Sequence, residues 1–435
     1  MKIKPKEATS IINSLISGVV PNLGIQHIAV GRSDETKALV NSLNEVKNGH
    51  SMVKFWIGDF GSGKSFMLHL LNTVAVKQKF VVANADFTPH NRLYSNDGKS
   101  VALYSAIMNN VAIRTKPEGG ALPNLMDRWI ERVMTETAKE NGISFSDVRS
   151  EKYSGHIEAK ISDTIKDITD VGGFDFGAVV SRYYHAFITE DEVLRRAALK
   201  WLKGEYTTKT EARQDLGVRQ IINDTNFYNM LKNFCKLFVS IGYSGFMINL
   251  DEAVNLYKLS TSAMRLKNYE KIMTIYNDCF QGKVGNLFIN IAGTREFLEN
   301  DRRGLFSYNA LKTRLETNKY ESLQIKDFAQ PVIRLTPLDH NEIFVLLKKL
   351  KSIFDLKYET KIDIDNDDIA NFMEEIFNKP GASEYLTPRE VIRDFLNVLN
   401  ILRQNPGVDV SHLIEEIEIT DERPDERALD AIREI

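Results

Sequence analysis

The sequence lacks several features that would place a protein in a particular class. Its 435 residues include only two cysteines, Cys235 and Cys279, without metal-ligand spacing, which argues against a disulfide framework or a zinc site. No apolar run approaches the length of a membrane span, and the basic N-terminus lacks the apolar segment of a signal peptide. The formal net charge of −3 gives no overall attraction to nucleic acid. We therefore expect a cytoplasmic globular protein of two or three domains.

One octapeptide, residues 58–65, fits the pattern G-x-x-x-x-G-K-[ST] of a phosphate-binding P-loop. The apolar residues 52–57 before it predict a buried strand, and the residues from Phe66 onward predict a helix, which is the context that this motif requires. Lys64 is expected to reach the β- and γ-phosphates of ATP, and the Ser65 hydroxyl is expected to bind Mg²⁺. A glycine-rich turn with an incidental lysine is the alternative. The candidate nucleotide-binding residues are Gly58, Asp59, Phe60, Gly61, Ser62, Gly63, Lys64, Ser65 and Phe66.

Short apolar segments separated by helical ones predict an α/β fold with a parallel sheet. A crossover between two parallel strands is much shorter than residues 87–244, so this stretch must contain an insertion. Apolar residues at helical spacing predict that the insertion, at about residues 120–230, is helical, with a loop at residues 171–177. The five predicted strands are residues 52–57, 80–85, 245–250, 286–292 and 330–335.

Outside the sheet and its insertion, the chain is expected to be mostly helical. Residues 7–18 form a predicted helix, residues 27–31 a short extended segment, and Ser33 is the expected N-cap of the next helix. After the fifth strand, helices are predicted to begin at Pro337 and Pro388. The predicted domains are an N-terminal segment at residues 1–50, an α/β core at 51–335, a helical lid at 336–405 and an acidic tail at 406–435.

Asp251 and Glu252 give the strongest independent support for ATP hydrolysis. They follow the apolar segment 245–250, which places them at the carboxyl end of a predicted strand. An Asp at this position can hold Mg²⁺ through its water shell, and the adjacent Glu can orient and deprotonate the attacking water. The alternative is a strand that simply ends in an acidic turn.

Three further residues are candidates for the catalytic site. Thr294 follows the fourth predicted strand, where a polar side chain can position the attacking water or act as the N-cap of the next helix. Arg314 lies just past that strand, and Arg389 lies at the start of a lid helix. Arginine binds phosphate oxygens bidentately. One of these two arginines can therefore act on the nucleotide of its own subunit, and the other can act as an arginine finger in a neighbouring subunit. An exposed helical arginine is the alternative for each, and Arg393 competes with Arg389.

This combination of P-loop, Asp-Glu pair, polar residue on the fourth strand and helical lid resembles the AAA+ superfamily. Further motifs lie at residues 18–21, 30–32, 58–65, 201–205, 216–218 and 242–245. These motifs resemble, more narrowly, the ATP-binding proteins of BREX bacteriophage-exclusion systems, the BrxC/BrxD family. The length of the chain and its short C-terminus favour the shorter BrxD group over the longer BrxC group.

The resemblance implies an ATPase of prokaryotic antiphage defence that works with DNA-modification and other BREX proteins. It also implies an initiator-like (Orc/Cdc6-like) core with the strand order 5-1-4-3-2, ATP and Mg²⁺ as cofactors, and a homo-oligomeric ring or arc. In such a core Gly31 and Arg32 would lie beside the adenine. Two departures weigh against direct DNA recognition: too few residues follow the lid for a winged-helix domain, and Thr294 stands where initiators often carry Asn.

Three functions are compatible with the sequence. The first is an ATP-hydrolysing motor or loader that assembles on double-stranded DNA or on partner proteins. The second is a nucleotide-gated switch or scaffold with slow hydrolysis. The third, a P-loop kinase, is disfavoured because small P-loop kinases rarely carry a strand-terminal Asp-Glu followed by a helical lid. A DNA contact would use the basic segment 195–219, for which an ordinary solvated helix is the alternative.

Overall fold

The computed structural model describes residues 3–95, 97–148, 151–168, 173–318, 326–378, 387–408 and 413. The chain divides into two compact units. The first unit comprises Met1–Thr36, Gly58–Thr73 and Leu335–Ile435, and the second comprises Lys37–Ile57 and Val74–Arg334. The P-loop therefore belongs to the same compact unit as the predicted lid, and the α/β core expected at residues 51–335 contributes to both units.

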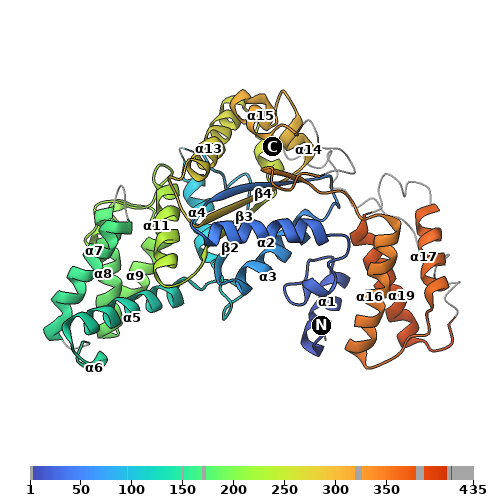
Figure 1. The fold of residues 1–435 in the computed structure, drawn as a ribbon, viewed down its shortest axis with the longest axis horizontal. Coiled ribbons are helices and arrows are strands. Elements are labelled where there is room, and N and C mark those ends of the chain that lie inside the picture. The colour runs from blue at the N-terminus through green and yellow to red at the C-terminus, as the bar shows by residue number, and fades with distance from the viewer. Residues whose placement is uncertain are drawn as a thin grey trace. The chain divides into compact units, whose positions relative to one another are not determined.

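The second unit is built on a five-stranded sheet in which all neighbouring strands are parallel (Figure 1). The order is β2-β3-β4-β1-β5, which read from the opposite edge is 5-1-4-3-2. Strand β4 lies between β1 and β3, and because the three strands are parallel, their carboxyl ends lie at one edge of the sheet. The strands are β1 (Met52–Ile57), β2 (Phe80–Asp86), β3 (Gly245–Asp251), β4 (Leu287–Gly293) and β5 (Val332–Arg334).

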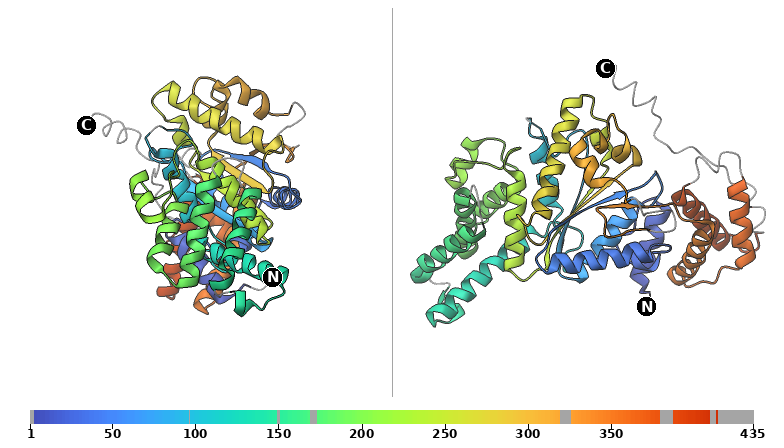
Figure 2. Two further views of the ribbon diagram at one scale, coloured as in Figure 1. Left: turned by 90° about the vertical axis from the view of Figure 1, so that its left-hand side faces the viewer. Right: turned by 45° about the horizontal axis from the view of Figure 1, so that its top comes forward.

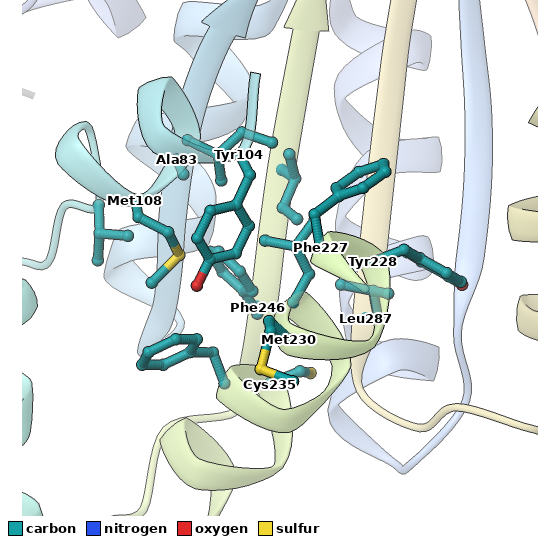
Figure 3. Close-up of a cluster of buried hydrophobic side chains, with 14 of the residues drawn as sticks. Ala83, Tyr104, Met108, Phe227, Tyr228, Met230, Cys235, Phe246 and Leu287 are labelled. Atoms are coloured by element: carbon teal, nitrogen blue, oxygen red, sulfur yellow. The ribbon is translucent and has the colours of Figure 1, made fainter. Parts of the chain in front are cut away.

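One face of the sheet is apolar, because alternate residues of its strands point to the same side. Helices α4 (Lys99–Asn109) and α11 (Phe227–Ser240) pack against this face. Their contact buries aromatic and sulfur-containing side chains, which form the main core of the unit. Figure 3 labels Ala83, Tyr104, Met108, Phe227, Tyr228, Met230, Cys235, Phe246 and Leu287 in this cluster.

The opposite face carries a row of polar side chains, which we call the asparagine ladder. Trp56 Nε1 donates to Asn290 Oδ1 (2.9 Å), Asn290 Nδ2 to Asn249 Oδ1 (2.9 Å), and Asn249 Nδ2 to Asn84 Oδ1 (3.0 Å). The ladder crosses four strands, β1, β4, β3 and β2, and Asn290 is fully buried. Buried amides that are hydrogen-bonded in this way favour one strand register over the others.

The insertion between β2 and β3 is helical, as the sequence predicts. Helices α5, α7, α8 and α9 pack against one another in sequence (green in Figures 1 and 2). The loop predicted at residues 171–177 is wrong from residue 173 onward, because α8 begins there and its buried Phe176, Val179 and Val180 recur at helical spacing. The insertion helices are α5 (Leu122–Asn141), α6 (Phe145–Val148), η2 (Glu151–Tyr153), α7 (Ser154–Ile168), α8 (Gly173–Thr189), α9 (Glu192–Leu202) and α10 (Lys209–Leu216).

The remaining helices of the second unit follow β3 and β4. They are α12 (Val254–Tyr257), α13 (Ser262–Phe280), α14 (Arg295–Glu299), η3 (Leu305–Ser307) and α15 (Asn309–Leu315). Two other helices, α2 (Ser33–Lys47) and α3 (Lys64–Lys77), have residues in both units. None of the helices within the described ranges is long and apolar enough to cross a lipid bilayer.

The first unit combines the N-terminal helix with the helices of the predicted lid. Helix α1 packs against α16 and α19. Helix α19 begins at Pro388, as the sequence predicts, and Thr387 caps it by accepting a hydrogen bond from Glu390 N (3.3 Å). The elements are α1 (Pro5–Ile16), η1 (Ile25–His27), α16 (His340–Tyr358), α17 (Asn366–Asn378) and α19 (Pro388–Gln404).

Three local predictions in the first unit are wrong. Residues 27–31 include the end of a 3₁₀ turn and no strand. Helix α2 already includes Ser33, and the carbonyl of Arg32 accepts from Thr36 N (3.0 Å), so Arg32 takes the capping position. Helix α16 begins at His340, not at Pro337, because Asp339 caps it. Most of the predicted acidic tail lies outside the described residues.

Candidate nucleotide site

The P-loop occupies residues 58–65, between the end of β1 and the first turn of α3. Gly63 has a φ of +88°, a conformation that only glycine adopts without strain. A Cβ atom at Gly58 would lie 2.4 Å from Ser62 Oγ and 2.8 Å from the carbonyl oxygen of Leu335, so no side chain fits there. Gly58 and Gly63 are therefore required by the backbone conformation and close packing of the loop. The loop leads into the N-terminus of α3, which favours the binding of an anion.

Three side chains of the loop, Lys64, Ser62 and Phe60, bear on its candidate role in phosphate binding. Lys64 Nζ donates to the carbonyl oxygens of Gly58 (2.9 Å) and Asp59 (2.8 Å), which holds its positive charge over the start of the loop. Ser62 is 1% exposed, and its Oγ has no hydrogen-bond partner among the described residues. Phe60 is 62% exposed. Ser65 and Phe66 lie in the first turn of α3. The positive charge of Lys64 and the N-terminus of α3 both favour a negatively charged group, such as a nucleotide phosphate.

Asp251 and Glu252 stand where the sequence predicts, at the carboxyl end of β3. Asp251 is the last residue of the strand and is in register with Asp86 of β2. Its Oδ1 accepts a hydrogen bond from the backbone N–H of Glu252 (2.8 Å). Glu252 is exposed and has a φ of +56°, an unusual conformation for glutamate. Such strain is common at functional positions.

Thr294 follows β4 and caps α14. Its hydroxyl accepts a hydrogen bond from Phe297 N at 3.3 Å. Capping is the structural alternative that the sequence analysis gives for Thr294. It is compatible with the other expected role, placing the attacking water, because the hydroxyl retains a proton to donate. The end of β4 lies between the ends of β1 and β3 in the sheet.

The two candidate arginines belong to different units. Arg314, on α15 of the second unit, is exposed, and its Nη1 donates to the carbonyl oxygen of Ala310 in the same helix (2.7 Å). Arg389, in the first turn of α19, is exposed and lies in the unit that contains the P-loop. Its competitor Arg393 lies one turn further along α19, with its Nε 3.8 Å from a carboxylate oxygen of Asp394.

Gly31 and Arg32 lie in the first unit with the P-loop. Gly31 has a φ of +67°, and a Cβ atom there would lie 2.2 Å from Glu342 Oε1. The Arg32 guanidinium is buried and donates to the carbonyl oxygens of Ser62 (2.9 Å) and Thr336 (2.7 Å). Burial lowers the pKa of Arg32, whereas the carboxylates of Glu35 and Glu342 raise it.

The partners of Arg32 could not be found from the sequence. Its two acceptors are main-chain carbonyls 30 and 304 residues away, and every residue type offers such a carbonyl. The only local signal is Glu35, three residues after Arg32, whose carboxylate lies 3.7 Å from the guanidinium.

The basic segment 195–219 is partly neutralised within the insertion. Arg195 Nη2 binds both carboxylate oxygens of Asp127, at 2.9 and 2.7 Å, and joins α9 to α5. Lys200 forms an ion pair with Glu211. These two side chains therefore stabilise contacts between helices, which reduces the charge that the segment offers to a phosphate backbone.

A parallel α/β sheet with a P-loop between an interior strand, here β1, and the following helix defines the class of P-loop nucleotide-binding proteins. The family model for "BREX system ATP-binding protein BrxC/D" matches residues 3–418, and the chain belongs to this family. No curated protein matches the chain. Membership in the family gives the chain an ATP-binding role in a BREX antiphage system and makes other BREX proteins its expected partners.

Proposed function

We propose that the chain is an AAA+ ATPase with an initiator-like (Orc/Cdc6-like) core, most like the BrxD group, that hydrolyses ATP within a BREX system. One observation carries the proposal: β1, β4 and β3 are adjacent and parallel, and they end in the P-loop, in Thr294 and in the pair Asp251-Glu252. This is the arrangement in which a phosphate-binding loop, a polar residue and two carboxylates act on one nucleotide.

Each residue has a proposed role. Lys64 and the backbone N–H groups of the P-loop bind the ATP phosphates. Glu252 orients the attacking water and accepts its proton, while Thr294 donates a hydrogen bond that helps to place this water. We assign Arg389 to the γ-phosphate of its own subunit, because it shares a compact unit with the P-loop, and Arg314 to the site of a neighbouring subunit. Gly31 and Arg32 belong to the adenine-side wall of the site.

Magnesium fits this set of residues. Among the described residues no three His, Cys, Asp or Glu side chains gather into a metal site. Mg²⁺ keeps several waters and usually binds through one or two protein oxygens and the substrate phosphates, so such a cluster is not needed. Ser65 and Asp251 would hold it, and it would neutralise charge that develops on the phosphates.

The test is ATP turnover by the full chain, measured as phosphate release, alongside ATP affinity. We expect Glu252→Gln to lower turnover at least about 100-fold while ATP stays bound, since only the proton acceptor is lost. Lys64→Ala should lose ATP binding. A Glu131→Gln variant, on the exposed side of α5, is the matched control and should turn over ATP normally. Unchanged turnover in Glu252→Gln would overturn the proposed mechanism.

Two alternatives would appear as distinct results. Nucleotide that co-purifies with the chain, together with negligible turnover by the unaltered protein, would establish a nucleotide-gated switch. Transfer of the γ-phosphate to a small-molecule acceptor, without phosphate release, would establish a kinase.

Double-stranded DNA remains a proposed partner beside other BREX proteins. If the segment 195–219 tracks phosphates, duplex affinity should fall steeply between about 50 and 200 mM salt. Arg213→Gln, in a residue of α10 that is exposed, should reduce this salt dependence. Affinity that does not change with salt would exclude a phosphate-driven contact.

A further inference from the structure

Arg32 forms a built link inside the first unit. The residue is 5% exposed, and its Nη2 donates to Ser62 O at 2.9 Å and to Thr336 O at 2.7 Å. Its Nη1 lies 3.7 Å from Glu35 Oε1, a carboxylate that is also buried. A buried guanidinium is strongly destabilising unless it is paired, so these partners account for its presence there.

The two carbonyls that Arg32 binds belong to segments with different roles. Ser62 lies within the P-loop, between two glycines with positive φ, Gly61 at +78° and Gly63 at +88°. Thr336 is the second residue after β5, at the root of the lid, and three residues before the N-cap of α16. One nitrogen of one side chain therefore joins the phosphate-binding loop to the start of the lid.

Both main lid helices begin against the same region. Gly31, next to Arg32, leaves no room for a side chain beside the Glu342 carboxylate. Glu342 in turn accepts a hydrogen bond from Asp339 N (2.9 Å) and closes the capping box of α16. A Cβ atom at Gly61 would lie 3.2 Å from Thr387, the N-cap of α19. The first turns of α16 and α19 are thus packed against the P-loop and its neighbour Gly31.

We infer that Arg32 is a positioning residue that couples the P-loop to the lid, in addition to any place it has in the adenine-side wall. The inference rests on the proposed binding of ATP at the P-loop. Phosphate in the loop restrains the backbone around Ser62. Because the same Nη2 group holds Thr336, the root of the lid is restrained with it, and lid opening becomes more costly when nucleotide is bound.

The experiment measures amide hydrogen exchange in the full chain, with and without ATP and Mg²⁺, together with ATP affinity. In the unaltered protein, ATP should slow exchange in the first turns of α16 and α19 by about tenfold or more. Arg32→Met should bind ATP more weakly, without losing it as Lys64→Ala does, and at saturating ATP the ATP-dependent slowing in α16 should fall below about twofold. Arg32→Lys keeps the charge but not the planar fork of donors, and we expect an intermediate effect.

Arg128→Met is the matched control. Arg128, on α5 of the second unit, donates to Tyr243 OH (2.6 Å), so the variant also loses an arginine hydrogen bond. Its lid exchange should respond to ATP as in the unaltered chain.

Two outcomes overturn the inference. One is an Arg32→Met variant that keeps the full ATP-dependent slowing in α16. The other is a folded Arg32→Met variant that loses ATP binding as completely as Lys64→Ala, because Arg32 would then act on the nucleotide directly. If Arg32→Met does not fold, an undiminished response in Arg32→Lys overturns it equally.

Failure of the proposed function is seen separately, as absence of ATP binding by the unaltered chain. The hydrogen bonds of Arg32 are then tested without nucleotide: Arg32→Met should speed exchange in the first turn of α16, and unchanged exchange there would count against the link.

Discussion

Glu252 adopts a backbone conformation that glutamate seldom takes, with a φ of +56°. Left-handed conformations cost non-glycine residues of the order of 1 kcal/mol or more. The chain therefore keeps glutamate at a position where glycine would be less strained, which is expected if the carboxylate is needed for function.

This predicts opposite effects of Glu252→Gly on stability and activity. The free energy of unfolding should rise by about 0.5–1 kcal/mol, because glycine relieves the strain, while ATP turnover is lost. Urea denaturation and phosphate release measure the two effects. Glu131→Gly, within the regular helix α5, should instead lower the free energy of unfolding by about 1 kcal/mol. A loss of stability in Glu252→Gly would contradict the argument.

Lys54 is a second residue with an unusual environment. It is buried on β1, and its Nζ donates to the carbonyl oxygens of Phe328 (2.9 Å), Ala329 (3.1 Å) and Gln330 (2.6 Å). Burial lowers its pKa from 10.5 to about 8, against the attraction of Glu45 and Asp327. Lys54 thus anchors the segment before β5 to the neighbouring strand β1.

The lowered pKa predicts how stability changes with pH. Between about 8 and 10.5 the folded state has released the Lys54 proton and the unfolded state has not, so folding is increasingly favoured as pH rises. Relative to Lys54→Met, the free energy of unfolding of the unaltered chain should therefore be larger at about pH 9.5 than at about pH 7.5. Urea denaturation of both proteins at the two pH values gives the comparison. A difference that stays constant or shrinks would contradict it.

At the scale of elements, the asparagine ladder ties together the strands that carry the candidate site. Asn249 lies two residues before Asp251, and Asn290 lies four residues before Thr294. Trp56 lies two residues before the first glycine of the P-loop. A shift of register in any of these strands would break the ladder and displace its end.

The ladder predicts a measurable coupling between Trp56 and Asn290. Asn290→Leu leaves Trp56 Nε1 and Asn249 Oδ1 without their partner, which should lower the free energy of unfolding by about 2–4 kcal/mol. Trp56→Phe should cost less in that background than in the unaltered chain, because the unpaired donor is removed. Urea denaturation of the four proteins gives the coupling. Equal costs in both backgrounds would mean that the two groups act independently.

At the scale of the whole molecule, the proposed assignment of Arg314 requires a neighbouring subunit. Because Glu252→Gln is expected to hold ATP without hydrolysing it, this variant should form a larger assembly with ATP than without it, by sedimentation velocity.

Mixing variants tests which arginine acts between subunits. Arg314→Ala and Lys64→Ala should each have little turnover alone. Mixed, they should recover part of it, because a Lys64→Ala subunit can supply Arg314 to its neighbour's intact P-loop. Arg389→Ala mixed with Lys64→Ala should not recover, since Arg389 is assigned to its own subunit. Recovery of turnover with Arg389→Ala but not with Arg314→Ala would mean that Arg389 acts between subunits and Arg314 within its own.

Much of the architecture could be predicted because it depends on local patterns. Short apolar runs such as 52–57 and 245–250 are typical of buried parallel strands, and each is a strand in the structure. Predictions of boundaries were weaker where a side chain outside the apolar pattern decides the end of an element. Asp339, which caps α16, moves the start of that helix to His340.

The sequence by itself determined the chemistry that is available: a glycine-rich loop with Lys64 and Ser65, and the carboxylates of Asp251 and Glu252 at a strand end. These residue types have their properties wherever they fold, and their spacing is encoded locally. Only the tertiary structure decided which distant groups meet. The link from Arg32 to Ser62 and Thr336, the ladder across four strands, and the grouping of the P-loop with the predicted lid depend on chain segments that are far apart in the sequence. The hydrogen-bonded partners in the link and the ladder are separated by 30 to 304 residues, and their pairing is set by packing and hydrogen bonding of the whole fold.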